Sequence, residues 1–122
     1  MNWEVGFDPA FDSEFNALPI AVQDELFAQA TLLEAFGPAL GRPRVDTLNG
    51  SRHANMKELR FQTADGVWRV AFAFDPRRKA ILLVAGDKSG VSERRFYRRL
   101  IKKADDRFDL HLEQLKDKRR TK

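Results

Sequence analysis

The chain has 122 residues, of which 43% are hydrophobic and 33% charged, with a formal net charge of +4 and no cysteine. This length and hydrophobic content suit a single domain over residues 1–122 with its own core, and the missing cysteine excludes a disulfide framework and thiolate chemistry. No apolar run is long enough to cross a bilayer and the first residues do not resemble a signal peptide, so a cytoplasmic location away from membranes is expected.

Charge is divided sharply along the chain. Residues 1–41 contain seven acids and no Lys or Arg, whereas all 22 Lys and Arg lie after Gly41. We interpret this division as an acidic helical flank beside a basic surface, whose commonest partner is nucleic acid. The alternative is that surface charge has drifted along the chain without consequence.

The first third of the chain predicts a strand and two helices. Residues 2–7 alternate apolar and polar side chains, which is typical of a half-buried strand. Asp8 and Pro9 are favourable residues for the N-cap and first position of a helix. Pro19 separates this helix from a second one, which ends at Gly37 and has an apolar stripe of Val22, Leu26, Ala30 and Leu33. We expect the two helices to pair as a hairpin with acids on their exposed faces.

The middle of the chain predicts three strands joined by short turns. Residues 38–54 are rich in Gly, Pro, Arg and Asn and are expected to form a loop. The pair Asp65-Gly66 is typical of a hairpin turn. The short connections predict an antiparallel meander with strands at residues 56–61, 67–74 and 79–85.

A final helix is expected from about residue 92 to residue 115, followed by a flexible basic tail at 116–122. Its apolar side chains recur every four residues, at Phe96, Leu100, Ala104 and Phe108. The predicted order is therefore β-α-α-β-β-β-α. This is an α+β domain, with helices against one face of an antiparallel sheet.

Alternation along the central strands separates an aromatic face from a polar one. The aromatic face must pack under the helices, and it carries Trp68, Val70, Phe72 and Phe74. The opposite face carries Arg60 and Arg69 on neighbouring strands, above the small side chains of Ala71 and Ala73. One interpretation is an open groove with two arginines. The other is an ordinary sheet surface on which Arg60 pairs with Glu58 or a cross-strand acid.

Arginine suits phosphate, because its guanidinium is always charged and can donate two parallel hydrogen bonds. Lys88 follows the third strand in a loop flanked by glycines, from which it could reach the same groove. His53 is either a general base or a polar loop residue. His53 and His111 show no metal-ligand spacing, so neither a metal nor any other cofactor is expected.

The start of the final helix is strongly basic. Like charges at spacing i, i+4, such as Arg95 and Arg99, cost helix stability, which favours an anionic partner over a merely solvated face. We therefore take Arg95 and Arg99 as candidate contacts for RNA or for an acidic protein segment. The basic residues of this stretch are Arg94, Arg95, Arg98, Arg99, Lys102 and Lys103.

Four stretches, in this order, resemble the RelE/ParE toxin superfamily, and most of all its phage-derived, HigB-like branch. They are Asn55-Met56-Lys57-Glu58-Leu59-Arg60, Trp68-Arg69-Val70-Ala71-Phe72, Ile81-Leu82-Leu83 with Gly86-Asp87-Lys88, and Phe96-Tyr97 opening a helix with Ala104-Asp105. The resemblance covers nearly the whole chain and implies a small RelE-like domain.

The resemblance also implies a function. Such proteins are toxins of bacterial toxin–antitoxin pairs, and they cut mRNA on the ribosome without a metal, through attack by the RNA 2′-hydroxyl. By position, Arg60, Arg69 and Lys88 match catalytic residues, while Lys57, together with His53, Arg95 and Arg99, is expected to contact RNA. The implied partners are the ribosome, mRNA and a helix-turn-helix antitoxin.

Two alternatives remain open. One is a ParE-like toxin that poisons DNA gyrase without nuclease activity, and the other is an inactive domain that keeps only the fold. The single tyrosine, Tyr97, lies in the final helix rather than near the end of the last strand, so the residues do not identify a general base.

Overall fold

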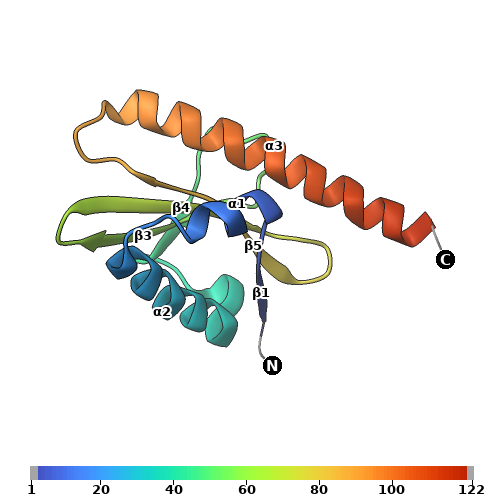
Figure 1. Cartoon of the computed structure of the whole chain (residues 1–122). Coiled ribbons are helices and arrows are strands. Elements are labelled where there is room, and N and C mark those ends of the chain that lie inside the picture. The colour runs from blue at the N-terminus through green and yellow to red at the C-terminus, as the bar shows by residue number, and fades with distance from the viewer. Residues whose placement is uncertain (1–2, 121–122) are drawn as a thin grey trace.

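A mixed five-stranded sheet is the centre of the computed structural model, which describes residues 3–120 (Figure 1). Its strand order is β1-β5-β4-β3-β2. The predicted antiparallel meander is confirmed in the three central strands, and the predicted first strand joins β5 in parallel at one edge. The strands are β1 (Glu4–Phe7), β2 (Val45–Thr47), β3 (Met56–Thr63), β4 (Gly66–Phe74) and β5 (Lys79–Asp87).

Two helices cover the aromatic face of the sheet, as predicted. Helix α1 (Pro9–Phe15) begins at Asp8, whose carboxylate accepts hydrogen bonds from the amides of Ala10 and Phe11. Helix α2 (Ile20–Phe36) continues into the short 3₁₀ turn η1 (Gly37–Ala39). The rings of Phe15 and Phe27 meet edge to face with their centroids 5.2 Å apart, so α1 and α2 are in contact as a hairpin requires.

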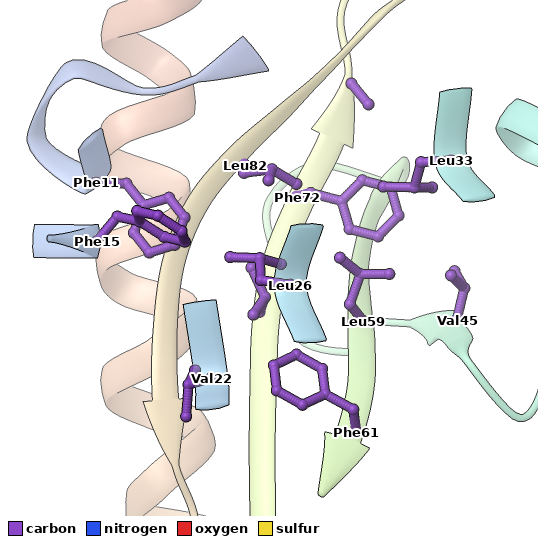
Figure 2. Packing of buried hydrophobic residues seen from close by; sticks show 12 residues of the cluster. Phe11, Phe15, Val22, Leu26, Leu33, Val45, Leu59, Phe61, Phe72 and Leu82 are labelled. Carbon is purple, nitrogen blue, oxygen red and sulfur yellow. The ribbon is translucent and has the colours of Figure 1, made fainter. Parts of the chain in front are cut away.

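The core on this face is continuous from the helices to the strands (Figure 2). Removing large apolar side chains from water contributes about 1.5–3 kcal/mol each, so this cluster is a main source of stability. Its fully buried members are Phe11, Val22, Leu26, Leu33, Leu59, Val70, Phe72, Ala80 and Leu82.

Helix α3 (Glu93–Arg120) corrects the expectation that all helices lie on one face. It crosses the opposite face of the sheet, so the sheet lies between α3 and α2 (Figure 1). Ala71 and Ala73 are fully buried there, in contact with the apolar stripe of α3. Small side chains that suggested an open groove instead let a helix approach the sheet closely.

The limits of two other predicted segments also change. The region predicted as a loop contains β2, which pairs with β3. The last helix continues past the predicted end at Leu115 to Arg120 and so includes part of the expected tail, whose residues 121–122 lie outside the described residues. Within residues 3–120, no helix is long and apolar enough to span a membrane.

Candidate functional site

Arg60 and Arg69 lie directly opposite each other on β3 and β4, on the face that α3 covers. Like charges in this position are unfavourable unless each is compensated. The guanidinium of Arg60 lies 3.5 Å from Asp46 of β2, and Nε of Arg69 lies 3.6 Å from Glu58 of β3. The sheet-surface interpretation was therefore correct in that both arginines have acidic partners.

The two arginines differ in exposure. The side chain of Arg69 is 7% exposed, because α3 lies over it, whereas that of Arg60 is 36% exposed. The expected open groove above Ala71 and Ala73 is thus wrong. What is open is a pair of hollows, both of which include Arg60 in their lining. The first includes Arg42 and Arg69, and the second includes Asp46, Glu58, Glu93, Arg94 and Tyr97.

Gly86 explains how α3 reaches this position. A Cβ atom on Gly86 would lie only 2.8 Å from the ring of Phe96, so a larger residue would push the start of α3 away from β5. The close approach brings Tyr97 over Arg69. Nε of Arg69 donates to Oη of Tyr97 at 3.2 Å, and Nη1 donates to the carbonyl of Trp68 at 2.9 Å.

Lys88 completes the cationic group. Its Nζ donates to the carboxylate of Glu93 at 2.9 Å, from the loop between β5 and α3. The pKa of Glu93 is lowered, first by the hydrogen bond from Lys88 and then by the charges of Lys88, Arg69 and Arg60. The positive charges of all three predicted catalytic residues therefore stabilise the ionised form of the Glu93 carboxylate. We call Arg60, Arg69 and Lys88 the cationic cluster.

Neighbouring acids remain ionised beside this cluster. The pKa of Asp46 is lowered by the hydrogen bond from Arg42, by the amide of Thr47 and by the charge of Arg60. In contrast, the pKa of Tyr97 is raised, mainly by burial and then by its hydrogen bond to Glu58. The phenol therefore stays protonated at neutral pH, which argues against tyrosinate as a ready base.

The other predicted RNA contacts are not all brought to the cluster. Lys57 lies on the opposite face of β3, because side chains alternate along a strand. Arg95 and Arg99 are exposed on the first turns of α3, and Arg99 borders another hollow, beside β5.

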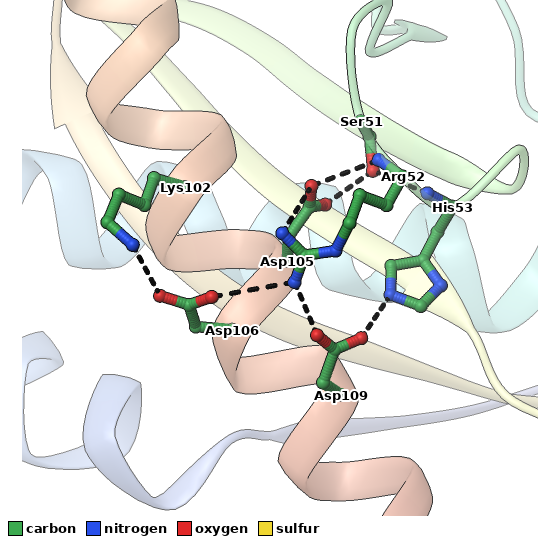
Figure 3. A network of polar contacts seen from close by, with 7 residues as sticks. All are labelled: Ser51, Arg52, His53, Lys102, Asp105, Asp106 and Asp109. Atoms are coloured by element: carbon green, nitrogen blue, oxygen red, sulfur yellow. Dashed lines mark hydrogen bonds and ion pairs between the residues drawn. The ribbon is translucent and has the colours of Figure 1, made fainter.

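His53 has a different place (Figure 3). Its Nε2 lies 2.7 Å from Asp109 of α3, and its ring packs against Phe108. Asp109 is twelve residues after Tyr97, which is roughly 18 Å along a helix. The structure thus assigns His53 to the contact between residues 51–53 and α3, and not to the cationic cluster.

Sequence reasoning missed four contributors to the site. Asp46 lies in a strand of three residues, which is too short to show alternation. Glu58 was considered as a partner of Arg60 and instead pairs with Arg69. Glu93 and Tyr97 did carry a signal: Glu93 is the single acid among basic residues, and Tyr97 lies one position outside the apolar stripe of α3.

No group of three or more potential metal-ligating side chains occurs in the part of the chain that the structure describes. The site is instead a set of fixed cations with ionised acids around it. Such an arrangement can bind an anion with several oxygens and can stabilise negative charge that develops on it.

Comparisons with known proteins give a family and relatives. The family model described as "Phage derived protein Gp49-like" matches residues 13–109. "Putative toxin HigB2" of Mycobacterium tuberculosis is 49% identical over 104 residues, which are 84% of this chain and 51% of that protein. "Putative toxin HigB3" of the same organism is 46% identical over 99 residues, covering 81% of this chain and 84% of that protein. The chain thus spans about half the length of the first relative and most of the second.

A solved structure supports the fold. An arginine-to-alanine double mutant of Escherichia coli toxin RelE in the free state superposes with a TM-score of 0.58. The match covers 84% of this chain and 97% of that chain at 13% sequence identity, a level of likeness that shows the fold alone.

Proposed function

The chain belongs to the phage-derived Gp49-like family, within the HigB-like branch of the RelE/ParE superfamily, and on this basis we propose that it is the toxin of a toxin–antitoxin pair. We propose further that it is an endoribonuclease that cuts mRNA on the ribosome and thereby stops translation. Residues 1–122 would form one toxin domain, acting in the cytoplasm.

The observation that carries the proposal is the cationic cluster. Arg60, Arg69 and Lys88 come from three segments. Lys88 is hydrogen-bonded to the carboxylate of Glu93, and the charges of Arg69 and Arg60 also lower the pKa of that carboxylate. A phosphodiester group in RNA is also an anion with several oxygens, and cleavage concentrates further negative charge on it. Preorganised cations around that position stabilise the transition state more than the ground state.

The chemistry follows from the nucleophiles at hand. The chain has no cysteine, and RNA carries its own nucleophile in the 2′-hydroxyl. The 2′-oxygen would form a bond to phosphorus while the bond from phosphorus to the 5′-oxygen breaks. The 2′-hydroxyl proton passes to solvent or a base, and the 5′-oxygen gains a proton. The products are a 2′,3′-cyclic phosphate and a 5′-hydroxyl.

Each member of the cationic cluster has a role in this step. Arg60 and Arg69 would hold the non-bridging oxygens of the phosphate, where negative charge increases. Lys88, on a loop and held by the exposed Glu93, would stabilise or protonate the departing 5′-oxygen. These roles need no metal ion and no other cofactor.

The proposed partners are mRNA on the ribosome and an antitoxin with a helix-turn-helix domain. The exposed Arg95 and Arg99 offer positive charge at the same end of α3 as Glu93 and Tyr97. Positive charge at this place would speed association with rRNA or with an acidic antitoxin segment, and would make binding sensitive to salt.

The deciding experiment is to add the purified protein to a translating extract and map the ends of the mRNA. We expect cuts within codons that appear only during translation and that leave 5′-hydroxyl ends. A 2′-deoxyribose at a mapped cut site should block the cut. Mild chelation that leaves ribosomes assembled should not block it.

Two outcomes would contradict the proposal. Products with 5′-phosphates, or full cutting of the deoxy substrate, would exclude the mechanism. Intact mRNA together with gyrase-dependent DNA breaks would indicate a ParE-like activity instead.

A further inference from the structure

Glu58 and Tyr97 have no role in the chemistry proposed above, yet both contact Arg69. Oη of Tyr97 donates to Oε1 of Glu58 at 2.8 Å and accepts from Nε of Arg69 at 3.2 Å. Oε1 of Glu58 also lies 3.6 Å from Nε of Arg69. The three residues come from β3, β4 and α3, so the hydroxyl of Tyr97 joins the helix to both strands.

Stability does not account for this arrangement. Glu58 and Arg69 are each 6% exposed. A buried ion pair must overcome the loss of hydration of both charges, and apolar side chains of similar volume often stabilise a fold as well or better. The position of Arg69 opposite Arg60 adds repulsion between like charges. A cost of this kind is expected where a charged group must be held in one orientation.

The hydroxyl of Tyr97 is suited to hold a charged partner permanently. Burial and the bond to Glu58 raise the pKa of Tyr97, so the hydroxyl keeps its proton throughout the neutral range. It therefore donates to Glu58 and accepts from Arg69 at the same time. A phenylalanine ring would fill the same space and could do neither.

These contacts fix the direction of the guanidinium. Nε is held by Tyr97 and Nη1 by the carbonyl of Trp68. Because the guanidinium is planar, two fixed nitrogens determine the position of the third. Among the described residues, no hydrogen bond involves Nη2, and Arg69 borders the hollow that it shares with Arg60.

We infer that Glu58 and Tyr97 are positioning residues that orient Arg69 so that its Nη2 group faces the hollow beside Arg60, ready to receive a phosphate oxygen of RNA. This inference rests on the proposed function. In this inference Tyr97 of α3 contributes to cleavage only by orienting Arg69.

A double-mutant cycle separates positioning from simple support of the fold. In the wild-type background, Tyr97→Phe should lower the single-turnover cleavage rate on ribosomes by about 10- to 100-fold, the range for a lost hydrogen bond to a charged group. The ribosome concentration for half-maximal rate should not change. In an Arg69→Ala background, Tyr97→Phe should cost less than about 2-fold more, because its target is already missing.

A spectroscopic measurement tests the same contact without RNA. The Nε proton of Arg69 should exchange slowly with water in the wild-type protein and much faster in Tyr97→Phe and Glu58→Gln. Leu112→Ala is the control, because Leu112 is a partly buried residue of α3 that packs in the core under its second half. It should lower stability without changing the exchange of the Arg69 proton or the cleavage rate of folded protein.

Each outcome has a distinct meaning. Fast exchange of the Arg69 proton in the wild type would overturn the inference. Additive effects of Tyr97→Phe and Arg69→Ala on the cleavage rate would overturn it as well, even if the wild type cuts mRNA normally. If the wild type cuts no mRNA on ribosomes, the proposed function fails, and the positioning role fails with it.

Discussion

Two successive stretches of α3, residues 93–103 and 104–115, which we call its first and second half, carry opposite charge and make different kinds of contact. Between Glu93 and Lys103 there are six Lys or Arg residues and one acid, whereas residues 104–115 contain four acids and one Arg. The first half lies beside the cationic cluster. The second half contacts several separate segments of the chain, so most of its charged side chains take part in the fold. Most of the positive side chains of the first half are exposed.

Three of the four acids of the second half, Asp105, Asp106 and Asp109, have partners within the fold (Figure 3). Asp105 is 2% exposed and accepts hydrogen bonds from the hydroxyl of Ser51 and the amide of Arg52. Asp109 contacts the side chains of Arg52 and His53. These contacts hold residues 51–53 against α3.

Two further residues of the second half reach other segments. Arg107 donates to both carboxylate oxygens of Glu14 in α1, at 2.8 and 2.6 Å, and to the carbonyl of Leu83 in β5 at 2.7 Å. His111 lies 2.8 Å from the buried carboxylate of Asp75. Apart from the exposed Glu113, the charges of this half are thus explained by folding.

The first half is different. Arg94 and Arg95 lie in the first turn of α3 and are exposed, although the positive end of the helix dipole disfavours cations there. Folding therefore does not explain this positive charge, whereas the proposed binding of an anion would. Substitutions in the two regions should accordingly affect different measurements.

The largest effect is expected from Arg60→Ala in the cationic cluster. Loss of one donor to the transition state typically lowers the rate by about 100- to 1000-fold. Stability should change by no more than about 0.5 kcal/mol, because the side chain is partly exposed. Single-turnover cleavage on ribosomes and urea unfolding measure the two quantities.

Arg77→Ala is the control for Arg60→Ala, because it removes an exposed arginine from the turn before β5. It should leave both rate and stability nearly unchanged. Undiminished cutting by the Arg60→Ala protein would remove Arg60 from the proposed site.

Asp105→Ala should show the opposite profile. Removing this buried carboxylate leaves the hydroxyl of Ser51 and the amide of Arg52 without their acceptor, which should cost about 2–3 kcal/mol of unfolding free energy. The cleavage rate of the folded fraction should not change. Asp106→Ala, at the next and exposed position, should cost only about 0–1 kcal/mol, as surface ion pairs do.

A stable but inactive Asp105→Ala protein would contradict the separation between the two halves of α3. It would show that residues 51–53 act in cleavage, and His53 would again be a candidate for the site.

Sequence patterns predicted the elements better than their contacts. Four-residue spacing identified α3, and alternation assigned the aromatic face of β4 correctly. The same alternation could not decide whether Ala71 and Ala73 face solvent or a helix, because small residues suit both. Tyr97 is 28 residues from Arg69 and 39 from Glu58, and no local pattern links positions so far apart.

The smallest predicted effect concerns Glu93, the one acid in the first half of α3. Lys88 holds the pKa of Glu93 below its usual value, so the carboxylate is ionised at neutral pH beside the three cations. A bound phosphate would have to share those cations with it. Glu93→Gln should therefore raise affinity for ribosomes carrying an mRNA with 2′-O-methyl riboses in the A-site codon, which cannot be cut. The gain should be about 2- to 5-fold at low salt, matching the upper part of the range for exposed ion pairs, and should fade as salt increases.

Glu113→Gln is a matched control, because it makes the same change in net charge at an exposed position in the second half, and it should leave affinity unchanged. Equal gains from the two variants would mean that only total charge matters. A loss of affinity in Glu93→Gln would mean that Glu93 holds Lys88 in place for RNA instead of competing with it.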